Sequence, residues 1–170
     1  MGAGPVVALL AMFLTGCAAE MLVQPAPDAA APEFRLPARI VYGGNREYLP
    51  RNLTDGGSGA RLTVRYAYDV VHGGERTNLF GVMFNPAAML GLPVIGKDTV
   101  AVSGRLEVLR GEEVAKTYDA TAALTNRPSL FYEGETYTEM RRRGLLAVRD
   151  SIESQVARDR ESLGRLLGSD

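Results

Sequence analysis

The side chains that most often carry chemistry are scarce in this chain. Its 170 residues include one Cys and one His, which are Cys17 and His72. A zinc site of the Cys₂His₂ or His₃ type cannot be built from them, and a lone Cys forms no internal disulfide. The sequence also contains no GxSxG, HExxH, P-loop or GxGxxG motif. We therefore predict no catalytic residue, no metal site and no cofactor.

His72 is the one candidate for acid–base chemistry that needs separate treatment. It stands before Gly73 and Gly74, where a strand is expected to end. Nucleophilic catalysis would require it beside a Ser or Cys and an orienting acid. No local signature supplies that arrangement, so we interpret His72 as a solvated loop histidine rather than as part of an envelope hydrolase.

The position of Cys17 indicates a different chemistry, which is lipidation of its thiol. The 16 residues before it carry no charged side chain, and residues 6–14 form an apolar run. That run is too short to span about 30 Å of hydrocarbon, which takes roughly 20 helical residues. It matches the apolar region of a secretory signal peptide followed by small residues at a cleavage site. The alternative interpretation of Cys17 is a buried structural cysteine.

The tetrapeptide Leu14-Thr15-Gly16-Cys17 resembles the lipobox of bacterial lipoproteins. The resemblance implies that the chain is cut between Gly16 and Cys17, and that Cys17 is acylated on its sulfur and on its new amino terminus. Two or more acyl chains anchor a protein stably, whereas one chain binds only marginally. The chain departs from the usual pattern because no Lys or Arg precedes the apolar run.

The residue after Cys17 bears on localisation. In Gram-negative lipoproteins an Asp at this position commonly retains the protein at the inner membrane, and this chain has Ala18 there. The resemblance therefore implies anchoring in the outer membrane, facing the periplasm. The expected partners are the membrane, through acyl chains on Cys17, and another envelope protein.

Residues 79–95 form an almost wholly apolar segment without a charged residue. Its glycines and prolines exclude a membrane-spanning helix. One interpretation is a core strand with a turn at Asn85-Pro86. The other is an exposed loop that enters a bilayer surface or a partner's groove, with these candidate contact residues: Phe80, Phe84, Met89 and Leu90.

Arg141, Arg142 and Arg143 form the only basic run in the sequence. Guanidinium groups pair well with phosphates, so Arg141 and Arg142 are candidates for contact with anionic lipid. The alternative is a solvated helix face, because consecutive helical residues point about 100° apart. With 19 Lys and Arg against 20 Asp and Glu, the net charge of −1 argues against a nucleic-acid partner.

The elements that must position these groups follow from hydrophobic periodicity. Alternation of apolar and polar residues predicts a half-buried strand over 61–71, and glycines and a proline predict a loop over 43–60. Three further strands are predicted, the last two as a hairpin joined through Gly111: 35–42, 99–109 and 114–124. Residues 18–34 are rich in Ala and Pro and read as an extended tether.

The C-terminal segment predicts a long helix. Thr136 and Glu139 have the spacing of a capping box, and an apolar stripe at helical spacing follows. Strands followed by a helix favour an α+β fold, with a small antiparallel sheet packed against the C-terminal helix. The expected organisation is a signal peptide over 1–16, a lipid anchor and tether over 17–34, and one α+β periplasmic domain over 35–170.

The second half of the chain resembles small outer-membrane accessory lipoproteins in topology. The shared features are the lipobox, a β-hairpin, an aromatic link such as Leu130-Phe131-Tyr132, and a long closing helix. No site residue carries over from a likeness of topology alone. The expected function is a non-catalytic envelope lipoprotein that acts as an accessory or scaffold subunit. The alternative is a carrier or assembly factor for lipid or lipopolysaccharide that uses residues 79–95.

Overall fold

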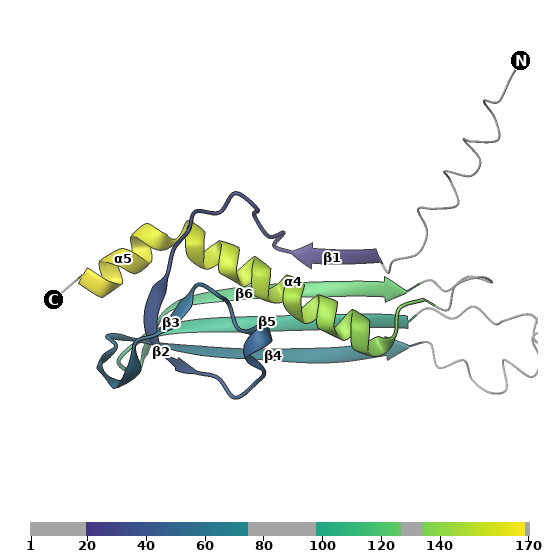
Figure 1. Cartoon of the computed structure of the whole chain (residues 1–170), viewed down its shortest axis with the longest axis horizontal. Coiled ribbons are helices and arrows are strands. Elements are labelled where there is room, and N and C mark those ends of the chain that lie inside the picture. Colours follow the sequence, from purple (N-terminus) through teal and green to yellow (C-terminus); the bar gives the residue numbers. More distant parts are fainter. Residues whose placement is uncertain (1–19, 75–97, 127–133, 169–170) are drawn as a thin grey trace, which may run out of the picture.

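A long antiparallel hairpin forms the centre of the fold in the computed structural model, which describes residues 20–74, 98–126 and 134–168 (Figure 1). β5 (Asp98–Arg110) and β6 (Glu113–Asn126) pair along their whole length. Their turn contains Gly111 with a φ of 64°, a conformation that glycine adopts without steric cost. β4 (Leu62–Gly74) pairs antiparallel with the other side of β5. The predicted hairpin and the predicted strand over 61–71 are confirmed.

The sheet has six strands in the order β1-β6-β5-β4-β2-β3. β2 (Leu36–Val41) confirms the strand predicted over 35–42, but it runs parallel to β4 and to β3 (Leu53–Asp55). The sheet is therefore mixed rather than purely antiparallel. Residues 42–61 connect β2 to β4 and are long enough for the crossover that a parallel pair requires. Within this predicted loop lie β3 and two short 3₁₀ helices, η1 (Arg46–Tyr48) and η2 (Gly57–Gly59).

The segment expected to be a free tether is part of the fold from Glu20 onward. β1 (Glu20–Gln24) pairs antiparallel with the outer edge of β6. Residues 25–35, which we call the strap, then cross to the C-terminal helix. There Ser151 Oγ donates to the carbonyl of Pro25 at 2.6 Å, and the backbone N–H of Asp28 donates to Ser154 Oγ at 3.0 Å. The tether interpretation was wrong for this stretch because the edge of β6 pairs with a five-residue strand that its Ala- and Pro-rich surroundings obscure.

The predicted terminal helix is confirmed as α4 (Tyr137–Arg158), which continues after Asp159 as α5 (Arg160–Gly168). The capping box is complete, because Thr136 Oγ1 accepts from the N–H of Glu139 and Glu139 Oε2 accepts from the N–H of Thr136. At the junction of the helices, Tyr118 Oη donates to Asp159 Oδ2 at 2.7 Å. Burial works to raise the pKa of Asp159, but Tyr118 and Lys116 outweigh it and hold that pKa below its usual value.

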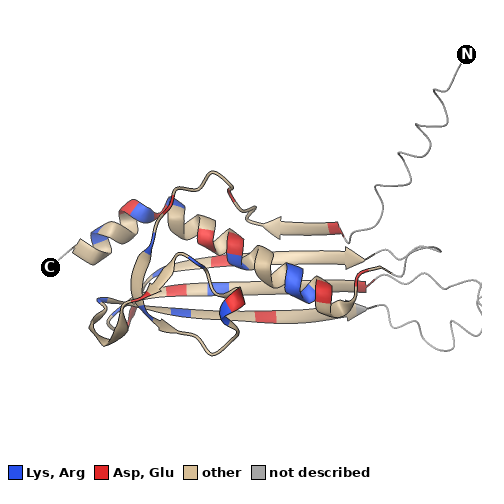
Figure 2. Ribbon diagram, in the orientation of Figure 1, with Lys and Arg blue, Asp and Glu red and all other residues tan. Residues whose placement is uncertain are grey.

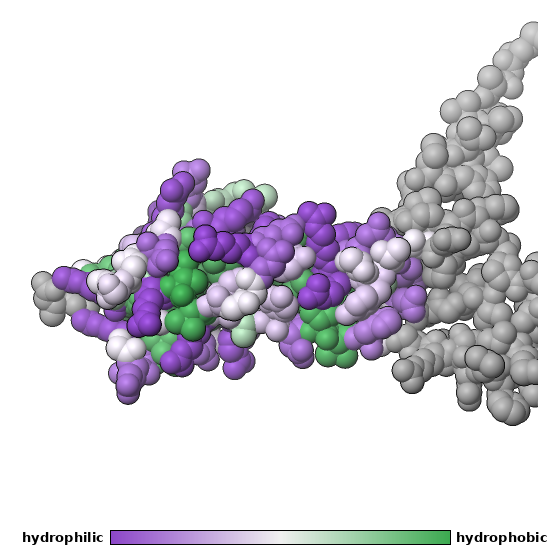
Figure 3. Space-filling view, turned by 60° about the horizontal axis from the view of Figure 1, so that its bottom comes forward, coloured by the Kyte–Doolittle hydropathy of each residue, from purple (hydrophilic) through white to green (hydrophobic). Residues whose placement is uncertain are grey.

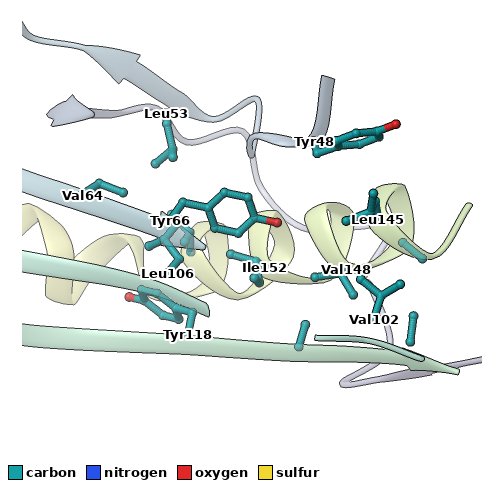
Figure 4. Packing of buried hydrophobic residues seen from close by; sticks show 14 of the residues in the cluster. Tyr48, Leu53, Val64, Tyr66, Val102, Leu106, Tyr118, Leu145, Val148 and Ile152 are labelled. Carbon is teal, nitrogen blue, oxygen red and sulfur yellow. The ribbon is translucent and has the colours of Figure 1, made fainter. Parts of the chain in front are cut away.

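The core lies between α4 and one face of the sheet (Figure 4). Two glycines allow helix and sheet to approach closely. A Cβ at position 104 in β5 would lie 2.5 Å from Val148 Cγ1, and one at position 144 in α4 would lie 2.7 Å from Val102 Cγ2. Gly144 therefore permits close packing in the middle of the helix. Around this contact the sheet and helix contribute fully buried apolar side chains: Val64, Val100, Leu106, Leu124, Leu145, Val148 and Ile152.

Candidate functional site

Four strands end together at one end of the sheet. Glu20 in β1 pairs with Thr125 in β6, and Asp98 in β5 pairs with both Asn126 in β6 and Gly74 in β4. We call this the flush end, and it lies at the right of Figure 1. The turn of the β5–β6 hairpin lies at the opposite end, about 40 Å away at about 3.3 Å per residue.

Exposed apolar side chains gather near the flush end. The described residues include six large apolar side chains that are exposed, and four of them lie within four residues of this end or at the start of α4. These four form the flush-end cluster: Met21, Leu22, Val71 and Tyr137. The other two, Val41 and Val114, lie elsewhere on the sheet. On the face shown in Figure 3, apolar residues form separate patches among polar ones.

Strand register explains how the cluster forms. On the face that α4 leaves uncovered, Leu22 pairs with Ala123, Ala123 with Ala101, and Ala101 with Val71. This row is apolar from β1 to β4. On the covered face, Met21 belongs to the adjacent row that ends at His72. The cluster therefore has members on both faces of the sheet, at a similar distance from the flush end.

His72 lies on β4 close to the flush end and is exposed. Its ring packs against Tyr137, the first residue of α4, with 4.7 Å between the ring centroids. An aromatic pair of this kind stabilises a contact between two elements. Among the described residues no group of three His, Cys, Asp or Glu side chains lies close enough together to hold a metal ion.

The predicted basic run lies at the start of α4, and its charges are divided among different partners. Arg142 Nη2 lies 2.7 Å from Glu47 Oε1 in η1, and this contact raises the pKa of the Arg142 guanidinium. Arg143 pairs with Glu135. Arg141 is half-buried. The three side chains thus do not form one cationic patch, which agrees with the interpretation as a helix face.

The uncovered sheet face is polar beyond its one apolar row. The next row across β1, β6, β5 and β4 contains Gln24, Thr121, Ser103 and Asp69. The row after it holds an exposed ion pair, in which Arg105 Nε lies 2.7 Å from Asp119 Oδ1. The side chains between these charged residues are small. The strand backbone therefore lies close to the surface of the uncovered face. A shallow hollow of about 220 Å³ lies between Leu22 and Val71.

A larger groove, of about 750 Å³, lies between the strap and α4. Its lining is mixed, since it includes the polar residues Asp28, Asn52, Asp150 and Glu153 together with two prolines, three alanines and Phe34. Asn52 is buried and donates through Nδ2 to the carbonyl of Glu153 at 3.0 Å, and within the described chain its Oδ1 has no hydrogen-bond partner. Arg51 bridges Glu153 and Asp150 at the rim. An acyl chain bound in this groove would remove its carboxylates from water, which is costly.

Several predicted site residues lie outside the described residues. These are Gly16 and Cys17 at the predicted cleavage and acylation site, and the four apolar candidates Phe80, Phe84, Met89 and Leu90. The described strands on either side of residues 75–97 end and begin at the flush end. Within the described ranges, no helix combines the length and apolar character that crossing a bilayer requires.

Sequence reasoning did not find the flush-end cluster. Its members come from three separate elements, and the register of β1 on β6 brings Met21 and Leu22 to the same end of the sheet as Val71, three strands away. The available signal was the short apolar run of residues 21–23, four residues after Cys17.

Comparison with known proteins adds no family to this description. No protein-family model, no curated protein and no solved structure matches the chain.

Proposed function

We propose that this chain is a lipid-anchored, non-catalytic accessory protein of the cell envelope that binds another envelope protein. The anchor is the acylated Cys17, in the outer membrane and facing the periplasm. The partner binds the sheet face that α4 leaves uncovered. The observation that carries the proposal is this uncovered face, which extends over β4, β5 and β6 next to a strand that begins three residues after Cys17.

The uncovered face has the size of a specific protein interface. β4, β5 and β6 have 13, 13 and 14 residues. Three strands spaced about 4.8 Å apart and about 40 Å long present roughly 600 Å². β1 and β2 extend the face on either side, toward the roughly 800 Å² per partner that is typical of stable complexes.

The chemistry of the face also suits a protein partner. Small side chains at Ala67, Ser103 and Thr121 leave low relief, so a partner can approach the strands closely. The exposed charges of Arg105 and Asp119 supply groups that fix orientation, and such charges contribute more to specificity than to affinity.

The alternative function, a lipid carrier, has less support in the described residues. The hollow of about 220 Å³ on the sheet face is smaller than typical ligand pockets of about 300–1,000 Å³. The larger groove has a mixed lining that includes four carboxylates, and the space between sheet and α4 is closed by the contacts at Gly104 and Gly144.

The test places a bulky charge in the centre of the uncovered face. Ser103→Arg adds a long side chain to an exposed position on β5, and Ser58→Arg adds the same side chain to an exposed loop position in η2. After crosslinking in cells, we expect Ser103→Arg to recover about tenfold less partner than the unchanged chain, which corresponds to about 1.4 kcal/mol of binding free energy. Ser58→Arg is expected to recover the normal amount.

Equal recovery by the two variants would contradict the assignment of this face. Circular dichroism of both variants controls for folding. Native mass spectrometry of the purified protein distinguishes the alternative, because a lipid carrier would retain bound lipid and lack a stoichiometric protein partner.

A further inference from the structure

We infer that the flush end of the sheet is a membrane-contacting surface, so that the sheet stands on the lipid bilayer with the β5–β6 turn pointing away from it. The lipid contact consists of the flush-end cluster, Met21, Leu22, Val71 and Tyr137. This inference rests on the proposed acylation of Cys17, and it adds a contact surface and an orientation to that anchor.

Only a short stretch of chain joins the anchor at Cys17 to the fold. β1 begins at Glu20, three residues after Cys17. A fully extended chain spans at most about 3.6 Å per residue, so Glu20 lies within about 11 Å of Cys17. The expected tether of 17 residues would have allowed the domain to stand clear of the headgroups. The pairing of β1 with β6 removes that freedom, because it fixes the first strand to the rest of the sheet.

The exposed apolar side chains lie close to the flush end. Leu22 is 62% exposed and Val71 is 58% exposed, and both lie on the apolar row two to three residues from the flush end. At about 3.3 Å per residue, this row lies about 7–10 Å from the end of the strands. An interface formed by headgroups and the first acyl carbons covers a comparable depth, since the polar regions add about 5–8 Å on each side of the hydrocarbon.

Tyr137 extends the same surface around the covered face. It is 41% exposed and is held against His72. A tyrosine ring combines an apolar body with a polar hydroxyl, and such rings are enriched where membranes meet water. Met21, which is 43% exposed, lies on the same face of the sheet as His72 but on β1, three strands away.

The charges at the flush end select the type of lipid surface. Glu20 begins β1 and Asp98 begins β5, both at this end (Figure 2). Arg143, at the start of α4, is paired with Glu135. The carboxylate of Asp98 is repelled by an anionic surface, so the cluster fits a surface of neutral, zwitterionic headgroups.

The chain offers a matched pair of residues for the test. Val71 is 58% exposed near the flush end, and Val114 is 47% exposed beside the β5–β6 turn. The two side chains are identical and similarly exposed, and they lie at opposite ends of one sheet. The full chain, produced in cells that process it, is reconstituted with methyl-labelled valine in phosphatidylcholine nanodiscs that contain a nitroxide-labelled lipid.

We expect loss of the Val71 methyl signals and retention of the Val114 signals, with both restored when the nitroxide is reduced. Retained Val71 signals, or equal losses at both valines, in protein that stays bound to the nanodisc would overturn the orientation and leave the anchor intact. Protein that does not stay bound would refute the anchor and the orientation with it.

Discussion

Replacing Ile152 by alanine is expected to lower the free energy of unfolding by about 2–5 kcal/mol, the range for buried aliphatic residues truncated to alanine. Ile152 is fully buried on the face of α4 that packs on the sheet. It lies next to Gly104, where the helix approaches β5 most closely. The truncation removes apolar contact area and leaves a cavity that the closely packed strands cannot fill by moving. Urea denaturation of the purified domain measures the change.

The matched control is Leu146→Ala in the same helix. Leu146 is only partly buried at the margin of the core, so its truncation removes less apolar area and leaves space that solvent can enter. We expect its cost to be clearly smaller than that of Ile152→Ala. Equal costs would contradict the placement of α4, because they would mean that the helix presents a different face to the sheet.

Replacing Gly104 by alanine is expected to cost about 1–3 kcal/mol, although alanine is no worse than glycine in a strand by intrinsic preference. A methyl group at this position would meet Val148 Cγ1 at 2.5 Å, with Ile152 Cδ1 and Tyr66 Oη each at 3.4 Å. Val148 and Ile152 are fully buried and Tyr66 is nearly so, so none of them has room to move away. The substitution therefore separates helix from sheet or forces a side chain from its rotamer.

Gly73→Ala in the neighbouring strand is the control for this substitution. The nearest atom to a methyl group at that position would be the carbonyl oxygen of Thr99, at 3.9 Å, which is ordinary van der Waals contact. We expect a change within about 0.5 kcal/mol, as for most exposed positions. Thermal unfolding of the two variants side by side measures the difference, and similar destabilisation of both would show that position 104 is not the close contact described above.

Much of the fold could be predicted because local patterns and tertiary packing agree. In β4, apolar residues alternate with polar ones from Leu62 to Tyr66, and the alternation matches the buried and exposed faces of the strand. At the start of α4, the hydroxyl of Thr136 accepts from the backbone N–H of Glu139, and the carboxylate of Glu139 accepts from the backbone N–H of Thr136, as their spacing indicates. Such devices depend on residues close together in sequence, so a single chain reveals them.

What could not be predicted depends on partners far apart in sequence. β1 is a strand because its residues 20–24 meet residues 121–125 of β6, and a five-residue segment before several prolines carries little signal of its own. β2 runs parallel to β4 because of the path taken by residues 42–61, which turn signals alone do not determine. The partner of Arg142 is Glu47, which is 95 residues away. The flush-end cluster is missed for the same reason.

The start of the fold at Glu20 also changes what acylation of Cys17 would do. With a free tether, acylation of Cys17 would fix only the compartment of the protein. With β1 starting at Glu20, acylation would also hold the folded domain at the bilayer and limit which surfaces a partner can reach. The uncovered sheet face begins at the flush end. A partner that binds this face would therefore lie beside the domain and close to the membrane surface.

Mass spectrometry of the N-terminal peptide, from protein extracted out of cell membranes, tests the central claim most directly. The account predicts a peptide that begins at Cys17 and carries a thioether-linked diacylglyceryl group and an amide-linked acyl chain. Cys17→Ser is expected to abolish both modifications and to release the protein from the membrane fraction. A peptide that runs through Gly16 and Cys17 with a free thiol would contradict the account.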